Sequence, residues 1–313
     1  MPIIFVLIDG VGLAPAGPSN PVAAGFVRLR QTLGAPLSAG LRVERSGLYA
    51  ASIDATLGLP GLPQSGSGHA AIYGGYNAAQ AQGRHQPSFP SVAMRAHLQR
   101  WNLLLAARQQ GARVAWANAY LPGYADAIAQ RRLRHTAGTW SALAAGLPLA
   151  GIAEVLAGTA LTWDIDRRLA RRRPDGAALP LLEPHAAGAV LARLARRHDL
   201  VAFETYLPDL AAHGRLPLTV AEVLTTVDAL LAGVIAALPA DTTLVVTSDH
   251  GNSEDATTRS HTRNPVPLLA LGPAAALFRD VQAIDQLAAA LLAALQGGSS
   301  PHSTTRLEEP CRC

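Results

Sequence analysis

The sequence predicts an α/β protein built on a doubly wound, mostly parallel sheet with a small inserted cap. Short apolar runs alternate along the 313 residues with longer stretches of helical periodicity. The apolar runs contain few polar residues, which is typical of parallel strands that helices cover on both faces. Hydrophobic residues make up 49% of the chain and charged residues only 15%, so the chain can bury a large core and is not a disordered polyelectrolyte.

The predicted elements follow one another as strand and helix in turn. Strands are expected at residues 3–8, 114–117, 200–203, 243–247 and 266–271, where turn or polar residues bound each apolar run. Helices are expected at residues 94–110, 186–197, 220–238 and 283–295. This alternation favours a sheet with helices on both sides.

The middle of the chain fits the alternation poorly. Residues 121–184 carry two arginine clusters, at 131–134 and 167–173, and we interpret this segment as a small insertion or cap over the sheet. The core is then expected to comprise residues 1–120 and 185–296. Residues 297–313 are rich in Gly, Ser, Thr and Pro and are predicted to be a disordered tail.

The charged residues exclude several enzyme classes. All 26 basic residues are arginine, so P-loop NTPases, protein kinases and pyridoxal enzymes, which need a lysine, are excluded. The net charge of +4 permits anionic partners without requiring them.

The expected location is the cytoplasm. The two cysteines, Cys311 and Cys313, cannot form a disulfide framework through the fold, which fits a reducing compartment. The first ten residues lack the basic segment of a signal peptide. No run of about 18 uncharged apolar residues occurs, so no membrane association is expected.

Carboxylates follow three of the predicted strands. Asp9 directly follows the first strand, Asp209 comes shortly after the third, and Asp249 and His250 come just after the fourth. Ligands of open α/β sheets bind at the carboxyl ends of the strands, so these side chains are expected to converge. Each aspartate taken alone is better interpreted as a helix N-cap. Together, however, unpaired carboxylates would repel each other unless a cation lay among them.

Two further histidines complete a candidate ligand set. His213 lies four residues after Asp209, so on a helix both would share one face, although such a pair alone is more often a surface contact. His261 lies on a loop before the last strand. Three aspartates and three histidines suffice for two divalent ions with mixed nitrogen and oxygen ligands.

A nucleophile is expected at Ser65. A Pro- and Gly-rich turn leads through Ser65 and Ser67 into an Ala-rich helical stretch. A serine at a helix N-terminus is well placed to meet an incoming phosphate, but its hydroxyl needs a base or a metal for activation. The alternative for either serine is plain N-capping.

These residues resemble the alkaline phosphatase superfamily. The motifs Ser65-x-x-Gly-His69, Asp209-x-x-x-His213, Asp249-His-Gly-Asn-x-Glu254 and His261-Thr-x-Asn-Pro-Val-Pro267 occur in the order of that superfamily, after Asp9. The chain looks most similar to the metalloenzyme domain of cofactor-independent phosphoglycerate mutase and phosphopentomutase. The last two motifs are the specific ones.

The resemblance implies two metal ions, Mn²⁺ or Zn²⁺, and a phosphoserine intermediate. Asp9, Ser65, Asp249 and His250 would hold one ion, with Ser65 as nucleophile. The second ion would be held by Asp209, His213 and His261.

The resemblance leaves the reaction open. The mutases insert a much larger domain between the nucleophile and the second half of the core, and they place a lysine near their metals that this chain lacks. We therefore expect a phosphomonoester hydrolase acting on a phosphorylated small molecule, with a phosphomutase as the alternative. A phosphodiesterase, a sulfatase or a metal-binding protein without activity are further alternatives, although the Cys/Ser-x-Pro-x-Arg context of sulfatases is absent.

Substrate contacts are the least explicit part of the sequence. Arg84, shortly after the nucleophile helix, and Arg263, two residues after His261, are candidates for holding the phosphate, and His69 is a third. The alternative for both arginines is a surface position. The arginine clusters also raise the alternative of a nucleic-acid-binding protein, but they match no known nucleic-acid-binding signature, and we expect no nucleic-acid partner.

Overall fold

The computed structural model describes residues 1–297. The predicted tail at 297–313, with both cysteines, therefore lies outside the described residues except for Gly297. A seven-stranded sheet forms the centre, in the order β2-β3-β9-β8-β1-β7-β4. Its strands are β1 (Ile3–Ile8), β2 (Arg42–Arg45), β3 (Leu48–Ile53), β4 (Val114–Trp116), β7 (Leu200–Thr205), β8 (Thr243–Thr247) and β9 (Val266–Leu271).

Most strands of this sheet point the same way. β4, β7, β1 and β8 pair in parallel, whereas β9 is antiparallel to β8, β3 to β9 and β2 to β3. Five of the seven strands consequently share one direction. The prediction of a mostly parallel sheet is confirmed, and all five predicted strands are present.

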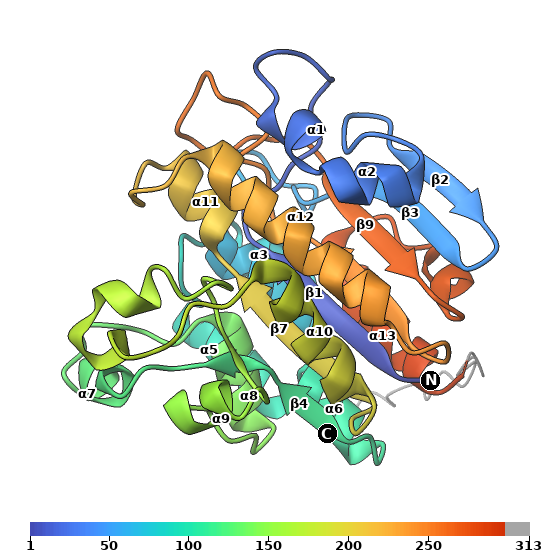
Figure 1. The fold of residues 1–313 in the computed structure, drawn as a ribbon. Helices are drawn as coiled ribbons and strands as arrows, with labels where there is room; N and C mark the ends of the chain where they lie inside the picture. Colours follow the sequence, from blue (N-terminus) through green and yellow to red (C-terminus); the bar gives the residue numbers. More distant parts are fainter. Residues whose placement is uncertain (298–313) are drawn as a thin grey trace, which may run out of the picture.

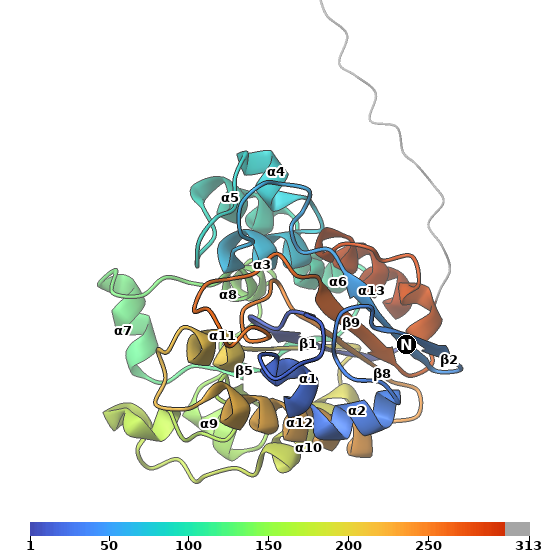
Figure 2. The same ribbon diagram turned by 90° about the horizontal axis from the view of Figure 1, so that it is seen from above.

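Helices cover both faces of the sheet (Figures 1 and 2). On β1, Ile3, Phe5 and Leu7 face one core cluster while the residues between them face the other. The first cluster is covered by α3 (Ser65–Gly74), α4 (Ala78–Gln82), α5 (Val92–Arg100), α6 (Leu103–Gln109), α8 (Ala137–Ala144) and α13 (Leu287–Leu295). The second is covered by α1 (Pro21–Gly25), α2 (Val27–Leu33), α10 (Pro184–Ala195) and α12 (Val220–Ala237).

Two local features differ from the expectation. The hairpin of β2 and β3 was not predicted, because β2 is a mostly exposed edge strand with charged residues at three of its four positions. The helix expected at 94–110 is two helices, since Trp101 adopts an extended conformation and Asn102 starts α6 by accepting a hydrogen bond from the Leu105 amide at 2.9 Å. The Asn102 amide group also donates to the Leu98 carbonyl, which closes the end of α5.

The segment 121–184 divides between two environments. Helix α8 packs against the core helices α3, α5 and α6. The remainder includes α7 (Gly123–Ala129), α9 (Ile152–Leu156), two short 3-10 turns and β6 (Leu161–Thr162), which pairs in parallel with β5 (Asn118–Ala119) just before the segment. This part has its own small apolar cluster and lies beside the main sheet (Figure 1). The domain boundaries at 121 and 184 stay a prediction.

Helix α12 is long and apolar enough to cross a membrane by length and composition alone. In the structure it packs against α10 and α2, and six of its aliphatic side chains are buried in the core. It also carries the buried carboxylate of Asp228, which accepts hydrogen bonds from the backbone amides of Arg28 and Leu29 at 2.9 Å each. Asp228 thereby satisfies two free amides in the first turn of α2.

Replacing Asp228 with alanine is expected to lower the free energy of unfolding by about 3 kcal/mol, because two backbone amides lose their acceptor. Asp228→Asn keeps one acceptor oxygen, so its free energy of unfolding should fall by less. Asp280→Ala, at an exposed position, is the control and should change stability by less than about 0.5 kcal/mol. The measurement is urea denaturation, and equal stability of Asp228→Ala and the control would contradict this role.

Candidate metal centre

The predicted ligands meet at one edge of the sheet. Asp9 follows β1 directly, Asp209 lies in α11 (Leu207–Ala212) after β7, and Asp249 and His250 follow β8. His261 precedes β9, whose opposite direction brings its start to the same edge. The structure thus gathers all six Asp and His residues into two groups, Asp209 with His213 and His261, and Asp9 with Asp249 and His250.

The first group presents ring nitrogens that face each other. The Nε2 atoms of His213 and His261 are 3.0 Å apart, and both lie within 3.4 Å of Asp209 Oδ1. The Nδ1 atoms are each 2.7 Å from a backbone carbonyl, of Arg259 and Pro63 respectively, so each Nδ1 must carry a proton. In the neutral rings both Nε2 atoms are then lone-pair acceptors pointing at one another. A cation between them removes this conflict.

The second group combines two carboxylates, an imidazole and the predicted nucleophile. His250 Nε2 lies 3.3 Å from Asp9 Oδ1 and from Asp249 Oδ2, and 3.0 Å from Ser65 Oγ. Asp9 Oδ1 and Asp249 Oδ2 are buried, and neither accepts a hydrogen bond of good geometry. Buried carboxylate oxygens without donors are costly, so both fit a metal ion.

The donor chemistry of both groups fits the ions that the sequence predicted. Each group offers carboxylate oxygen and imidazole nitrogen, the mixed set that suits Zn²⁺ and also accepts Mn²⁺. The structure places every predicted ligand, Ser65 included, in the expected group. Their role as ligands stays a prediction, as does the identity of the ion.

The pKa shifts of Asp9 and His69 show that negative charge is crowded at this site. Burial, and then the charges of Asp249 and Asp209, raise the pKa of Asp9 well above its ordinary value. Burial alone would lower the pKa of His69, but the Asp249 charge and the close approach of the Asp249, Asp9 and Glu204 carboxylates outweigh burial and raise that pKa. The protein therefore favours positive charge at this point of the sheet edge.

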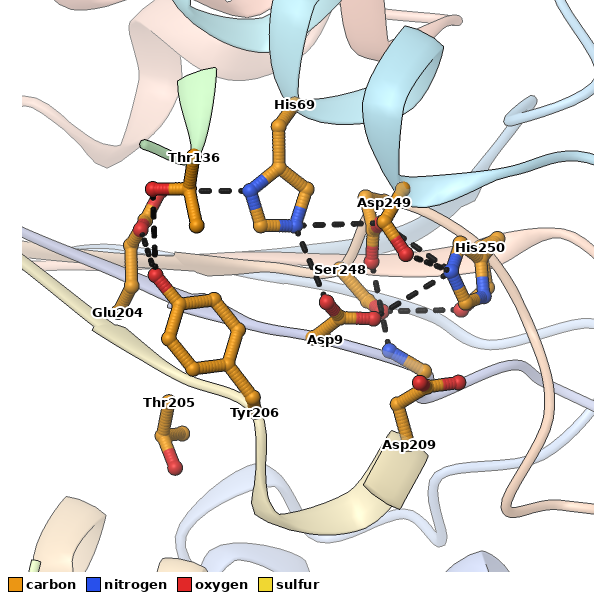
Figure 3. A network of polar contacts seen from close by, with 12 residues as sticks. Asp9, His69, Thr136, Glu204, Thr205, Tyr206, Asp209, Ser248, Asp249 and His250 are labelled. Carbon is orange, nitrogen blue, oxygen red and sulfur yellow. Dashed lines mark hydrogen bonds and ion pairs between the residues drawn. The ribbon is translucent and has the colours of Figure 1, made fainter. Parts of the chain in front are cut away.

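His69 connects the metal centre to a second buried network (Figure 3). Its Nε2 lies 3.3 Å from Asp9 Oδ2 and 3.2 Å from Asp249 Oδ2, while its Nδ1 lies 3.4 Å from Glu204 Oε1. Glu204 is fully buried and accepts a short hydrogen bond of 2.5 Å from the Tyr206 hydroxyl. Neither Glu204 nor Tyr206 was predicted from the sequence. A charged residue at the end of an otherwise apolar strand was the signal that could have found Glu204.

The hydrogen bonds of Glu254 explain why the Asp249-to-Glu254 motif ends in a glutamate. Its side chain is buried and accepts hydrogen bonds from the Gly12 amide at 3.0 Å, the Asn252 amide at 2.8 Å and the Asn264 side chain at 3.0 Å. The Thr262 hydroxyl also donates to it. Glu254 therefore ties together the loops after β1 and β8 and the loop before β9, which carry most of the ligands.

Helix α3 sits directly against the ligand loop. A Cβ atom at Gly68 would lie 2.9 Å from Asp249 Cβ and 3.0 Å from the Asp249 carbonyl oxygen, so no other residue fits there without displacement. The helix begins at Ser65, as predicted, and Ser65 is half-buried at its first position. The glycine thus sets the approach of the nucleophile helix to the metal ligands.

The predicted phosphate-binding arginines lie elsewhere. The Arg263 guanidinium donates to the backbone carbonyls of Leu59 and Gly61, so it fastens the loop before α3. Arg84 is exposed. Neither lines the cavity of about 490 Å³ that opens onto Asp9, Ser65 and Asp209, so the structure does not support the placement that we expected for them. His69 does line this cavity.

The arginines of the predicted cluster at residues 167–173 lie in different environments. Arg167 is buried and donates to the carbonyls of Pro180 and Val155, and Arg168 pairs with Asp166 at 2.6 Å. Arg173 pairs with Asp175 at 3.2 Å and lines the cavity. The cluster is therefore not one continuous basic surface.

The two ligand groups predict about two bound divalent ions per chain. Asp249→Asn and Asp209→Asn should each lose one equivalent, because each removes a ligand from a different group. Asp255→Asn is the matched control, since this carboxylate lies in the same loop as Asp249 but, among residues 1–297, accepts hydrogen bonds only from Thr257. Metal content measured by inductively coupled plasma spectrometry checks this, and chelation should lower Tm because the ions bind only the folded chain. Wild-type metal content in both ligand variants would refute the assignment.

Comparison with known proteins gives a family model and a set of similar folds. Residues 185–296 match the model of the metalloenzyme superfamily, a stretch that includes five of the six Asp and His ligands. A search of curated proteins finds no match.

Three solved structures illustrate the fold. The cold-active alkaline phosphatase of a psychrophilic Shewanella sp. has a TM-score of 0.55 at 14% identity, over 94% of this chain and 100% of that one. The alkaline phosphatase of the Antarctic bacterium TAB5 has a TM-score of 0.51 at 14% identity, over 94% and 97% of the two chains. Leishmania mexicana phosphoglycerate mutase has a TM-score of 0.50 at 12% identity, over 96% of each chain. The resemblance to the metalloenzyme superfamily is therefore confirmed by sequence over residues 185–296, and most of the chain has the fold of the alkaline phosphatases.

Proposed function

We propose that the protein is a metal-dependent phosphoryl-transfer enzyme that hydrolyses a phosphorylated small molecule through a phosphoserine at Ser65. The observation that carries this proposal is the position of Ser65. Its hydroxyl lies 3.0 Å from His250 Nε2, at the first residue of α3, beside the group formed by Asp9, Asp249 and His250. Metal ligands around a hydroxyl allow an ion to activate it as a nucleophile. The helix N-terminus beside it provides a binding site for the anionic phosphoryl group.

Asp9, Ser65, Asp249 and His250 would hold one ion and Asp209, His213 and His261 the other, as Mn²⁺ or Zn²⁺. When bound, the ions would lower the pKa of the Ser65 hydroxyl and neutralise the charge of the phosphoryl oxygens. Ser65 Oγ then forms a bond to phosphorus as the bond from phosphorus to the ester oxygen breaks. The alcohol leaves with the proton that Ser65 gives up, and water later cleaves the phosphoserine to release inorganic phosphate.

The network behind His69 has a positioning role in this proposal. His69 lies between the carboxylates of Asp9 and Asp249 on one side and Glu204 on the other. The buried Glu204 carboxylate accepts from Tyr206 and fixes the orientation of the ring. Ligand carboxylates held in this way keep their geometry when metal binds.

A phosphomutase is the second candidate. The cavity beside Ser65 is lined by Arg134, Arg173 and Arg215, and these cations could retain a dephosphorylated product until the phosphoryl group returns. Product analysis separates the two reactions, because a hydrolase releases inorganic phosphate in step with substrate loss and a mutase releases none. Action in the cytoplasm, without a nucleic-acid partner, is part of the proposal and stays a prediction.

Ser65 and Ser67 provide a matched pair for testing the nucleophile. Ser65→Ala should abolish the covalent phosphoenzyme and reduce turnover to background, as measured by intact mass after a pulse of substrate. Ser67 is buried, donates to the Gln64 carbonyl and accepts from the Gln86 amide, both at 3.1 Å. Ser67→Ala should therefore keep the phosphoenzyme while losing about 1 kcal/mol of stability. A phosphoenzyme that survives Ser65→Ala would disprove the assignment.

A further inference from the structure

The cavity beside the metal centre is large compared with a phosphate group. Its volume is about 490 Å³, and Asp9, Ser65, His69 and Asp209 form the wall that it shares with the metal centre. Sites of about 300–1,000 Å³ hold ligands larger than a three-carbon phosphoester. The opposite wall comes from the segment between β4 and α10, so the cavity has room for the part of a substrate that leaves with the ester oxygen.

Aromatic side chains are concentrated in this cavity. The chain has only 4 Trp, 6 Tyr and 5 Phe, yet five of these residues line the cavity and each is partly exposed: Phe89, Tyr120, Tyr124, Trp163 and Tyr206. The rings of Trp163 and Tyr206 are 6.0 Å apart, and Tyr206 in turn stacks at 6.2 Å from the ring of His69. A series of rings therefore leads from the metal centre to the wall formed by the insertion. Partly exposed rings in a cavity favour a flat, apolar partner.

The cavity also carries guanidinium groups that are free to bind an anion. Arg134 and Arg215 line it, both are exposed, and neither side chain has an ion-pair or hydrogen-bond partner among residues 1–297. Arg173 lines it too, but is paired with Asp175. Free arginines near a metal centre suit a phosphate ester, because a guanidinium can bind two phosphoryl oxygens at once.

We propose that this cavity binds the nucleoside part of a nucleoside monophosphate, with the base against Trp163 and Tyr206 and the phosphate at Ser65. The proposal rests on the proposed function and names its substrate class. A nucleoside has the required flat ring and polar sugar, and stacking on aromatic side chains accepts any base. A three-carbon acid such as phosphoglycerate would leave the aromatic wall in contact with water.

Adenosine 5′-monophosphate and ribose 5-phosphate are the matched substrates for testing this. Both carry the same phosphate ester on a pentose, and the first differs by its base. We expect kcat/KM of the wild-type chain to be at least about tenfold higher for the nucleotide, the range of one stacked base. Equal values, or a preference for ribose 5-phosphate, would overturn the proposal.

Variants locate the preference in the cavity. Trp163→Leu should bring the ratio of the two kcat/KM values toward one, whereas Trp140→Leu, a partly buried tryptophan outside the cavity, should keep the wild-type ratio. Arg134→Gln should lower kcat/KM for both substrates, and Arg132→Gln, on the same segment but outside the cavity, is its control. A Trp163→Leu variant that keeps the wild-type ratio would count against the proposal.

A binding measurement separates this proposal from the proposed function. Equilibrium dialysis of the two compounds against the metal-loaded Ser65→Ala chain measures the affinity of the cavity for each compound without turnover. If no phosphate ester, p-nitrophenyl phosphate included, is hydrolysed by the wild-type chain, the proposed function fails, and tighter binding of the nucleotide still supports the cavity assignment. If p-nitrophenyl phosphate is hydrolysed but the nucleotide binds no better than ribose 5-phosphate, only the cavity assignment fails.

Discussion

The crowding of buried carboxylates at one edge of the sheet is the constraint on which the rest of the site depends. Asp9, Asp209 and Asp249 are all less than 10% exposed, and burial together with the charges of Asp249 and Asp209 raises the pKa of Asp9. Such a group is unfavourable in a folded protein unless cations balance it. Imidazoles supply part of this balance, and the facing Nε2 atoms of His213 and His261 offer two ligand atoms to a cation that would supply the rest.

The fold holds these charges in place through backbone contacts between neighbouring loops. The Val11 amide donates to Ser248 Oγ at 2.9 Å, and the Ser253 amide and hydroxyl both donate to the Gly10 carbonyl, at 2.9 and 2.7 Å. Together with Glu254, these bonds fix the loops after β1 and β8 relative to each other through groups that are not metal ligands. Much of the repulsion between the carboxylates is therefore opposed by hydrogen bonds within the scaffold.

How much of this could be predicted from the sequence depends on the range of the interactions. The central strands and the ligand positions follow from local apolar runs and from the rule that ligands collect at strand ends, so Asp9, Asp209 and Asp249 could be expected to meet. The start of α3 at Ser65 also followed from its Pro- and Gly-rich turn.

Residues whose role depends on distant partners could not be predicted. Arg263 was expected near the phosphate because of its position next to His261, but its guanidinium reaches the carbonyls of the loop before α3. Glu204 acquires its role only because α3 brings His69 above it. The aromatic lining of the cavity likewise comes from four separate segments, and no local pattern connects Phe89 with Trp163.

The close approach at Gly68 has a mechanical consequence. Because the backbone of α3 lies against Asp249 at Gly68 without an intervening side chain, we expect this helix and the ligand loop to move together. A tilt of the helix would push directly on the ligand loop and would carry Ser65 and Asp249 in the same direction. Within the segment between β4 and α10, helix α8 packs against the nucleophile helix. The rest of that segment lines the far side of the cavity, so we expect entry and exit of ligands to depend on its motion, while the alignment of the reacting groups stays constant.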